Sequence, residues 1–187
     1  EFMTYMIVLK IGLSGLSFTY YLSKNGARKK SGVLFFGIFY ALSGYIAAYS
    51  WNIMWLDCII LFPIVCLGLE RLVNRGSGFL YSISLGLCIL SNYYISIMIC
   101  IFMVIYFAAL LILKKRNNFK KIIVSAVQFS VFSLLAGGLS ALVLLPEIYA
   151  FRMTASGDFN FPSNFNSYFS IFDMIARHIG NVQVEIG

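Results

Sequence analysis

One short stretch of the chain, Tyr49 to Asp57, gathers the residue types that chemistry on a polar molecule requires. It contains both tryptophans and Asp57, the only acidic residue between Glu1 and Glu70. Long apolar runs lie on either side. A carboxylate between two membrane spans is costly in free energy, so by default it marks a functional site. We therefore expect this stretch to face an external cavity in which a polar substrate is handled.

The spacing of these residues favours a carbohydrate site. Trp51 and Trp55 are four residues apart, and Asn52 and Trp55 are three apart, so on a helix each pair would share a face. We expect Asp57 in the first turn of the next span, where the positive helix end would keep it ionised. Aromatic rings stack on sugar CH faces, and a carboxylate can accept a hydroxyl proton as general base. Asp57 is therefore the catalytic candidate.

A purely structural explanation of the same residues stays open. Tryptophan and tyrosine collect at membrane interfaces in many proteins, and Asp57 could be a simple helix cap. The functional interpretation is favoured because Trp51, Asn52, Trp55 and Asp57 cluster on the same side of the membrane as the turn at Asn92.

Further candidates for binding the substrate lie downstream. Asn92, like Asn52, can hydrogen-bond to hydroxyl groups, and Tyr93 and Tyr94 add aromatic surface and donors. Glu147 is a weaker candidate, since an acid at a helix end is usually only solvated. Arg152 could meet a phosphate or could be an ordinary surface charge.

The composition indicates a polytopic membrane protein. The 187 residues are 60% hydrophobic and 11% charged, with mean hydropathy +0.87, whereas about a quarter of a soluble domain is charged. The net charge of +7 comes from basic clusters between apolar runs. This is the positive-inside pattern of membrane proteins, and it argues against a nucleic-acid partner.

The four cysteines all lie in apolar runs, and none has the spacing of metal ligands. We expect them to remain thiols that fill the core. The single histidine, His178, has no cysteine or second histidine nearby. We therefore predict no metal site built by the protein, although a divalent cation could assist a leaving phosphate.

The apolar runs predict an all-α transmembrane bundle of about six spans. A single crossing by the long run 79–113 would place the basic residues at 114–121 outside, against the positive-inside rule. We therefore predict a hairpin that turns at residues 91–94, with a first arm of ~18 Å whose tip lies below the outer surface. The expected spans are residues 3–22, 32–48, 55–69, 79–90, 95–113 and 122–145.

Several residues should shape these spans. Lys10 interrupts the first span, and it is paired inside the bundle, faces a wet cavity or snorkels to the interface. Pro63 should kink the third span or end its first half, and Pro146 should end the sixth. Small residues predict close helix packing at Gly12, Gly15, Ala136, Gly137, Ser140 and Ala141.

We expect two regions. Residues 3–147 form the transmembrane core, and residues 148–187 form an external segment with one short amphipathic helix at about residues 170–178. The three basic clusters, at residues 24–30, 71–75 and 114–121, should lie in the cytoplasm.

Five stretches, in this order, resemble the YfhO-like family of bacterial multi-pass membrane proteins. The most specific are the Trp-Asn-x-x-Trp-x-Asp stretch ending at Asp57 and Ser-Asn-Tyr-Tyr at 91–94; the others lie at residues 9–15, 41–45 and 144–146. The family is similar to GT-C glycosyltransferases. The resemblance therefore implies the bacterial plasma membrane, a polyprenyl-phosphate sugar as donor, and a wall polymer such as lipoteichoic acid as acceptor.

The resemblance also implies what this chain lacks. Family members are several times longer and begin with a span and an external loop that carries an acidic residue, the usual catalytic carboxylate of GT-C enzymes. We expect this chain to start after that loop and to be inactive alone. Asp57 would then be a residue of the substrate site rather than the base.

Two other functions fit the same residues. A transporter or flippase of lipid-linked saccharides would use the same aromatic and polar cavity without chemistry, and paired broken helices in an inverted repeat would favour it. A non-catalytic scaffold of a wall-synthesis complex would tolerate the loss of Asp57.

Overall fold

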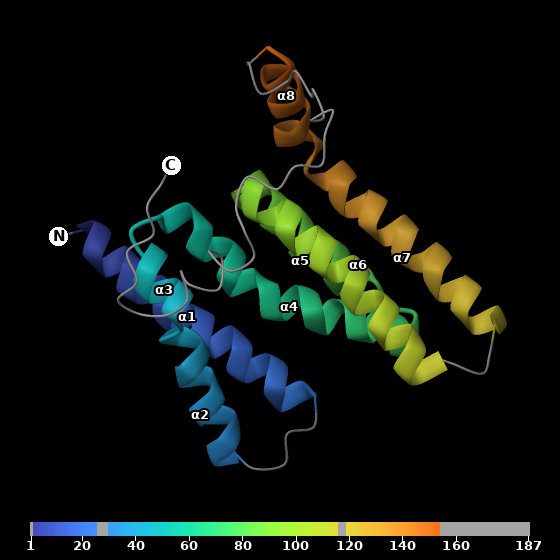
Figure 1. Ribbon diagram of the computed structural model, residues 1–187, viewed down its shortest axis with the longest axis horizontal. Coiled ribbons are helices and arrows are strands. Elements are labelled where there is room, and N and C mark those ends of the chain that lie inside the picture. Colours follow the sequence, from blue (N-terminus) through green and yellow to red (C-terminus); the bar gives the residue numbers. More distant parts are fainter. Residues whose placement is uncertain (1, 26–29, 116–118, 154–187) are drawn as a thin grey trace, which may run out of the picture. The chain divides into compact units, whose positions relative to one another are not determined.

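The computed structural model describes residues 2–25, 30–115 and 119–153, without the side chains of residues 30, 114, 115, 151 and 152 (Figure 1). Within these ranges the chain is helical and has no strand, as the hydropathy predicted. The helices are α1 (Phe2–Lys24), α2 (Lys30–Ala41), α3 (Gly44–Tyr49), α4 (Ile53–Arg75), α5 (Phe79–Ser91), α6 (Tyr93–Lys115), α7 (Phe119–Leu139) and α8 (Ala141–Arg152).

Five apolar segments in the described residues are long enough to cross a membrane, and α5 is a shorter apolar helix. Four of the five segments are single helices, and the fifth, Ser31–Tyr49, combines α2 and α3. The all-α polytopic bundle expected from the sequence is therefore confirmed.

Contacts between side chains fix the directions of the central helices. Lys10 bonds to Asp57 and Tyr21 bonds to Glu70, so α1 and α4 run in the same direction. Helix α6 runs in this direction too, because the ring of Phe102 packs against that of Phe62 and, further along both helices, Tyr106 bonds to Glu70.

Helix α5 runs in the opposite direction. Gly68, late in α4, lies against Tyr81 early in α5, whereas Cys58, early in α4, contacts Cys88 late in α5. The chain therefore reverses at Asn92 between α5 and α6. The hairpin predicted from the charge pattern is confirmed, and its first arm has 13 residues.

The core is centred on α4 and α5. Eleven residues of α4 are buried, and Gly68 lets it approach α5 so closely that an added Cβ would lie 2.6 Å from the Tyr81 backbone. Large apolar side chains on α1, α2, α6 and α7 face outward. Such surfaces suit lipid tails, which do not penalise exposed hydrophobic groups.

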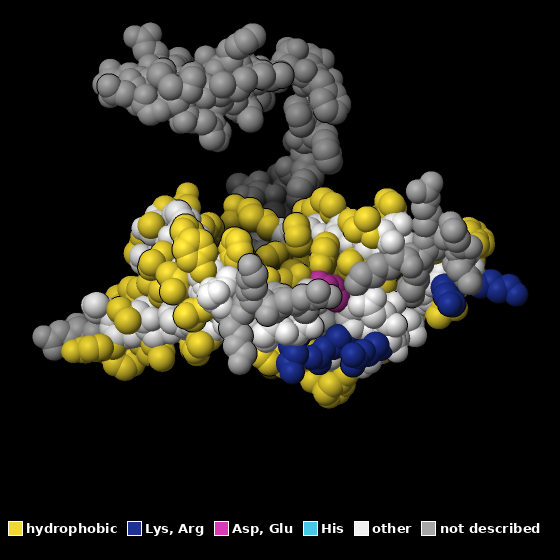
Figure 2. Space-filling view, turned by 90° about the horizontal axis from the view of Figure 1, so that it is seen from below, with side chains coloured by type: hydrophobic (Ala, Val, Ile, Leu, Met, Phe, Trp, Pro, Cys, Tyr) yellow, Lys and Arg dark blue, Asp and Glu magenta, His cyan; other side chains and the backbone are white. Residues whose placement is uncertain are grey.

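Basic side chains gather at one end of this bundle. Because helix directions alternate, the ends of α1 and α4 and the start of α7 lie together. The described basic residues there are Lys24, Arg71, Arg75, Lys120 and Lys121. Figure 2 shows Lys and Arg side chains gathered in groups on the visible face, beside hydrophobic side chains. The positive-inside rule makes this the expected cytoplasmic end.

The prolines do not end the helices that contain them, and the kink that was the alternative for Pro63 stays a prediction. Helix α4 continues through Pro63 to Arg75, and α8 continues through Pro146 to Arg152, so Pro146 does not end the sixth span. A proline removes one backbone donor, and a helix in a membrane protein can tolerate this when neighbouring groups compensate. The break comes at Ser140 instead, whose N–H is shared between the carbonyls of Ala136 and Gly137.

The small residues are used on one face only. Ala136 and Ser140 are buried, and Ser140 Oγ donates to Gly86 O of α5 at 2.9 Å. A Cβ added at Gly137 would have no neighbouring atom within 4 Å. The first span behaves similarly, since Gly15 packs closely against α2 while Gly12 has open space.

The chain divides into one unit of residues 1–149 and a second of residues 150–187. Of the second unit, the structure describes only residues 150–153, where α8 ends. The amphipathic helix expected at residues 170–178 lies outside the described residues.

Candidate functional site

Lys10 and Asp57 form an ion pair between α1 and α4. Lys10 Nζ lies 2.7 Å from Asp57 Oδ1 and 2.8 Å from Oδ2, and it also donates to Ile53 O at 3.1 Å. The Lys10 side chain is 12% exposed and that of Asp57 is 37% exposed. Of the three settings open for Lys10, the structure therefore selects pairing inside the bundle.

Asp57 does not cap a helix. Helix α4 begins at Ile53 and has no acidic residue in its first turn, so Asp57 is already in the second turn. The expected position of Asp57 in the first turn is wrong, because the span starts earlier than its hydropathy indicated. The positive partner of Asp57 is the ammonium of Lys10 instead.

A chain of aromatic rings lies around the same turns of α4. The ring centroids of Tyr45 and Tyr49 are 5.2 Å apart, those of Tyr49 and Trp55 are 5.6 Å apart, and those of Trp55 and Tyr94 are 6.3 Å apart. We call Tyr45, Tyr49, Trp55 and Tyr94 the aromatic chain. It joins α3, α4 and α6. Tyr45 was not among the residues expected at the site, although its i,i+4 spacing from Tyr49 was a usable signal.

The predicted cluster therefore separates into two groups. Successive helical residues are rotated by about 100°, so Trp55 and Asp57 point to nearly opposite sides of α4. Trp55 accordingly faces α3 and α6, and Asp57 faces α1. The ion pair and the aromatic chain flank α4 at the same level.

Trp51 and Asn52 lie in the turn before α4, so the shared helix face with Trp55 is not formed. Trp51 is 65% exposed, and its Nε1 donates to Ala48 O at 3.2 Å. Asn52 occupies the N-cap position of α4 without a capping bond from its side chain. The helix begins only after these two residues, which a residue-spacing argument could not detect.

Asn92 has a structural task at the hairpin turn. Its Oδ1 accepts the N–H of Ile95 at 2.9 Å, which caps the start of α6. The amide oxygen of Asn92 is thus already engaged, and its role toward a hydroxyl group stays a prediction. The neighbouring tyrosines, Tyr93 and Tyr94, are 42% and 51% exposed, and Tyr94 belongs to the aromatic chain.

The two remaining candidates lie on α8. Glu147 Oε2 is buried and has no hydrogen-bond partner among the described residues. This oxygen is therefore not the freely solvated group usual at a helix end. Arg152 ends α8, and its side chain lies outside what the structure describes.

The comparison with protein families identifies the chain. The family model described as bacterial membrane protein YfhO matches residues 1–183. The chain belongs to the YfhO family. It is accordingly a bacterial membrane protein, as the sequence motifs indicated. No curated protein and no solved structure matched the chain.

A second polar cluster in this YfhO-family chain was missed by sequence reasoning. Glu70 is 7% exposed, and its Oε1 accepts hydrogen bonds from Tyr21 Oη at 2.7 Å, from Asn25 Nδ2 at 2.8 Å and from Tyr106 Oη at 2.5 Å. The cluster joins α1, α4 and α6 near their C-terminal ends. The expected third span ended at residue 69, so Glu70 fell just beyond it, whereas the structure buries its carboxylate among the partners that such burial requires.

Metal coordination has little support in the described ranges. No group of three or more His, Cys, Asp or Glu side chains lies close enough there to hold an ion. The cysteines are free thiols, and Cys58, Cys66 and Cys88 are buried. The groups that the structure describes at the ion pair are an ammonium and a carboxylate, with the aromatic chain at the same level of α4.

Proposed function

We propose that this YfhO-family membrane protein is a GT-C-type glycosyltransferase. It would move a sugar from a polyprenyl-phosphate carrier to a cell-wall polymer such as lipoteichoic acid on the outer face of the membrane. The observation that carries the proposal is the Lys10–Asp57 ion pair, set at the same level of α4 as the aromatic chain.

The two groups suit the two parts of such a substrate. Aromatic rings offer flat faces to sugar CH groups, and three rings from three different helices, Tyr49, Trp55 and Tyr94, follow one another here. An ammonium such as that of Lys10 can stabilise the negative charge that develops on a leaving phosphate. Both groups are built on helices rather than on loops, which favours precise positioning.

The reaction would proceed by attack of an acceptor hydroxyl oxygen on the anomeric carbon. The bond from that carbon to the phosphate oxygen breaks, and polyprenyl phosphate leaves with the bonding electrons. The hydroxyl proton passes to a carboxylate that acts as general base. Asp57 can be reached by a hydroxyl because 37% of its side chain is exposed, although both oxygens also bind Lys10.

The bidentate contact with Lys10 also supports a scaffold function, because it would serve equally well as a structural link. The sugar content of the wall polymers distinguishes the two functions. In the bacterial host, Asp57→Asn should abolish glycosylation of the polymer while the protein remains at normal abundance in the membrane. Unchanged glycosylation at equal abundance would refute a role for Asp57 in the working site.

A further inference from the structure

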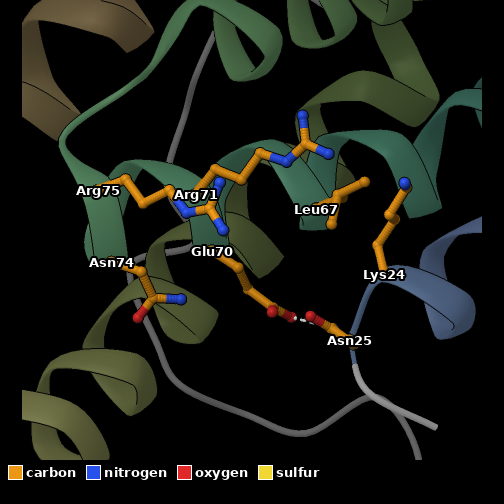
Figure 3. Close-up of a pocket in the computed structure, with 7 residues that line it drawn as sticks. All are labelled: Lys24, Asn25, Leu67, Glu70, Arg71, Asn74 and Arg75. Atoms are coloured by element: carbon orange, nitrogen blue, oxygen red, sulfur yellow. Dashed lines mark hydrogen bonds between the residues drawn. The ribbon is translucent and has the colours of Figure 1, made fainter.

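A cavity of about 270 Å³ lies between α1 and α4 at the end of the bundle opposite Asp57. This is slightly smaller than a site for a drug-sized ligand, which typically measures about 300–1,000 Å³. It is lined by Lys24, Asn25, Leu67, Glu70, Arg71, Asn74 and Arg75 (Figure 3). The cavity is therefore of a size to take one small polar group.

The lining carries an excess of positive charge. Lys24, Arg71 and Arg75 give +3 and Glu70 gives −1, so the net charge is +2. None of the three basic side chains forms an ion pair with an acid among the described residues. Such a concentration of unpaired cations favours an anionic ligand.

Glu70 forms no ion pair with these cations among the described residues. Figure 3 shows its carboxylate directed at Asn25, and Oε1 also accepts the hydroxyls of Tyr21 and Tyr106. Since the donors come from α1 and α6, the carboxylate is used to hold these helices against α4. The guanidinium groups of Arg71 and Arg75 take no part in these bonds.

The donors suit a phosphate group. Arg71 and Arg75 are four residues apart on α4 and so lie on one side of the helix. A guanidinium presents a planar fork of N–H groups that matches phosphate oxygens. Asn25 and Asn74 add amide groups to the lining of this cavity. Two further basic residues, Lys120 and Lys121, lie outside it and line a neighbouring cavity.

We propose that this cavity binds a phosphate group at the expected cytoplasmic end of the protein. The phosphate comes from the headgroup of an anionic lipid or from a soluble phosphate compound. The inference is independent of the proposed glycosyltransferase activity, because it concerns the other end of the bundle.

Binding of two probes to the detergent-purified protein tests the proposal. The probes are a short-chain phosphatidylglycerol, with phosphatidylcholine as the neutral comparison, and inorganic phosphate. Arg71→Gln and Arg75→Gln should each weaken binding of the preferred probe about tenfold, since each removes a charge-assisted bond. Lys120→Gln removes the same charge outside this cavity and should change binding less than about twofold.

Arg71→Lys is a control for misfolding, because it keeps the positive charge and removes only the planar guanidinium group. It should weaken binding less than Arg71→Gln does. Displacement of bound phosphatidylglycerol by inorganic phosphate would assign the site to soluble phosphates, and its absence would assign it to lipid. Equal losses in Lys120→Gln and the arginine variants, or binding of neither anionic probe, would overturn the proposal.

Discussion

Lys10 Nζ and Asp57 Oδ1 lie 2.7 Å apart, although their residues are separated by 47 positions in the chain. This contact joins α1 to α4 within a bundle whose outer surface is largely apolar. Lys10 is the basic residue that interrupts the first span. Asp57 is the only acidic residue before Glu70 in the described part of the chain.

Removing one partner of this pair should destabilise the protein. Lys10→Met or Asp57→Asn should each cost about 1–3 kcal/mol, because the remaining group loses its charged hydrogen bonds. The cost should be lower than the ~3–5 kcal/mol of a fully buried pair, since Asp57 is partly exposed. Thermal unfolding of the purified variants measures the effect.

The double variant Lys10→Met/Asp57→Asn is the control for this prediction. Its unfolding midpoint should be closer to the wild type than that of either single variant, because no charge is left unpaired. Strictly additive losses would mean that the two side chains do not stabilise one another.

Gly68 should be intolerant of a side chain. Gly68→Ala places a Cβ 2.6 Å from the Tyr81 backbone, so α4 and α5 must separate, at a cost of about 1–3 kcal/mol. Gly137→Ala is the matched control, because no atom lies within 4 Å of the added Cβ. It should stabilise α7 by about 0.5–1 kcal/mol through helix propensity. A similar loss of stability in both variants would argue against the close α4–α5 contact.

Helix α5 should separate two sides of the membrane despite having only 13 residues. In a background with all four cysteines replaced by alanine, Ser77→Cys and Ser91→Cys place single thiols at its two ends. In intact cells, an impermeant maleimide should label residue 91 and leave residue 77 unlabelled until the cells are opened. Labelling of both residues from outside would contradict the hairpin.

Trp55 and Trp51 should differ in importance. The ring of Trp55 lies near those of Tyr49 and Tyr94, whereas Trp51 is exposed and has no ring contact among the described residues. If the aromatic chain binds the sugar, Trp55→Ala should reduce glycosylation of the wall polymer at least about tenfold, and Trp51→Ala should reduce it less than about twofold. The opposite ranking would place the sugar at the turn before α4.

The fold was largely predictable because hydropathy and charge act over whole segments. The basic residues after position 113 predicted, through the positive-inside rule, that the chain reverses direction near residue 92, and the structure confirms this reversal. Helix ends were less predictable because local bonds decide them. Ser140 ends α7 through a shared hydrogen bond, and the chain continues through Pro146, which a proline rule alone does not foresee.

Lys10 and Asp57 could be singled out from the sequence, but their pairing could not. Hydropathy marks Lys10 and Asp57 as costly in a membrane, yet it contains no information on the rotation of α1 about its axis. That rotation decides whether the lysine meets Asp57, water or lipid. The Glu70 cluster was missed because its partners Tyr21 and Tyr106 lie 49 and 36 residues away, and hydropathy does not indicate which helices pack together.

The transfer reaction itself tests the central proposal most directly. Membranes that contain the native protein, Asp57→Asn or the exchanged pair Lys10→Asp/Asp57→Lys are supplied with a labelled polyprenyl-phosphate sugar and a wall-polymer acceptor. We predict transfer by the native protein and a loss of at least about 100-fold in Asp57→Asn, the scale of general-base catalysis. The exchanged pair should restore protein stability but not transfer. Full transfer by the exchanged pair would make the ion pair a structural link, and absence of transfer by abundant native protein would contradict the glycosyltransferase proposal.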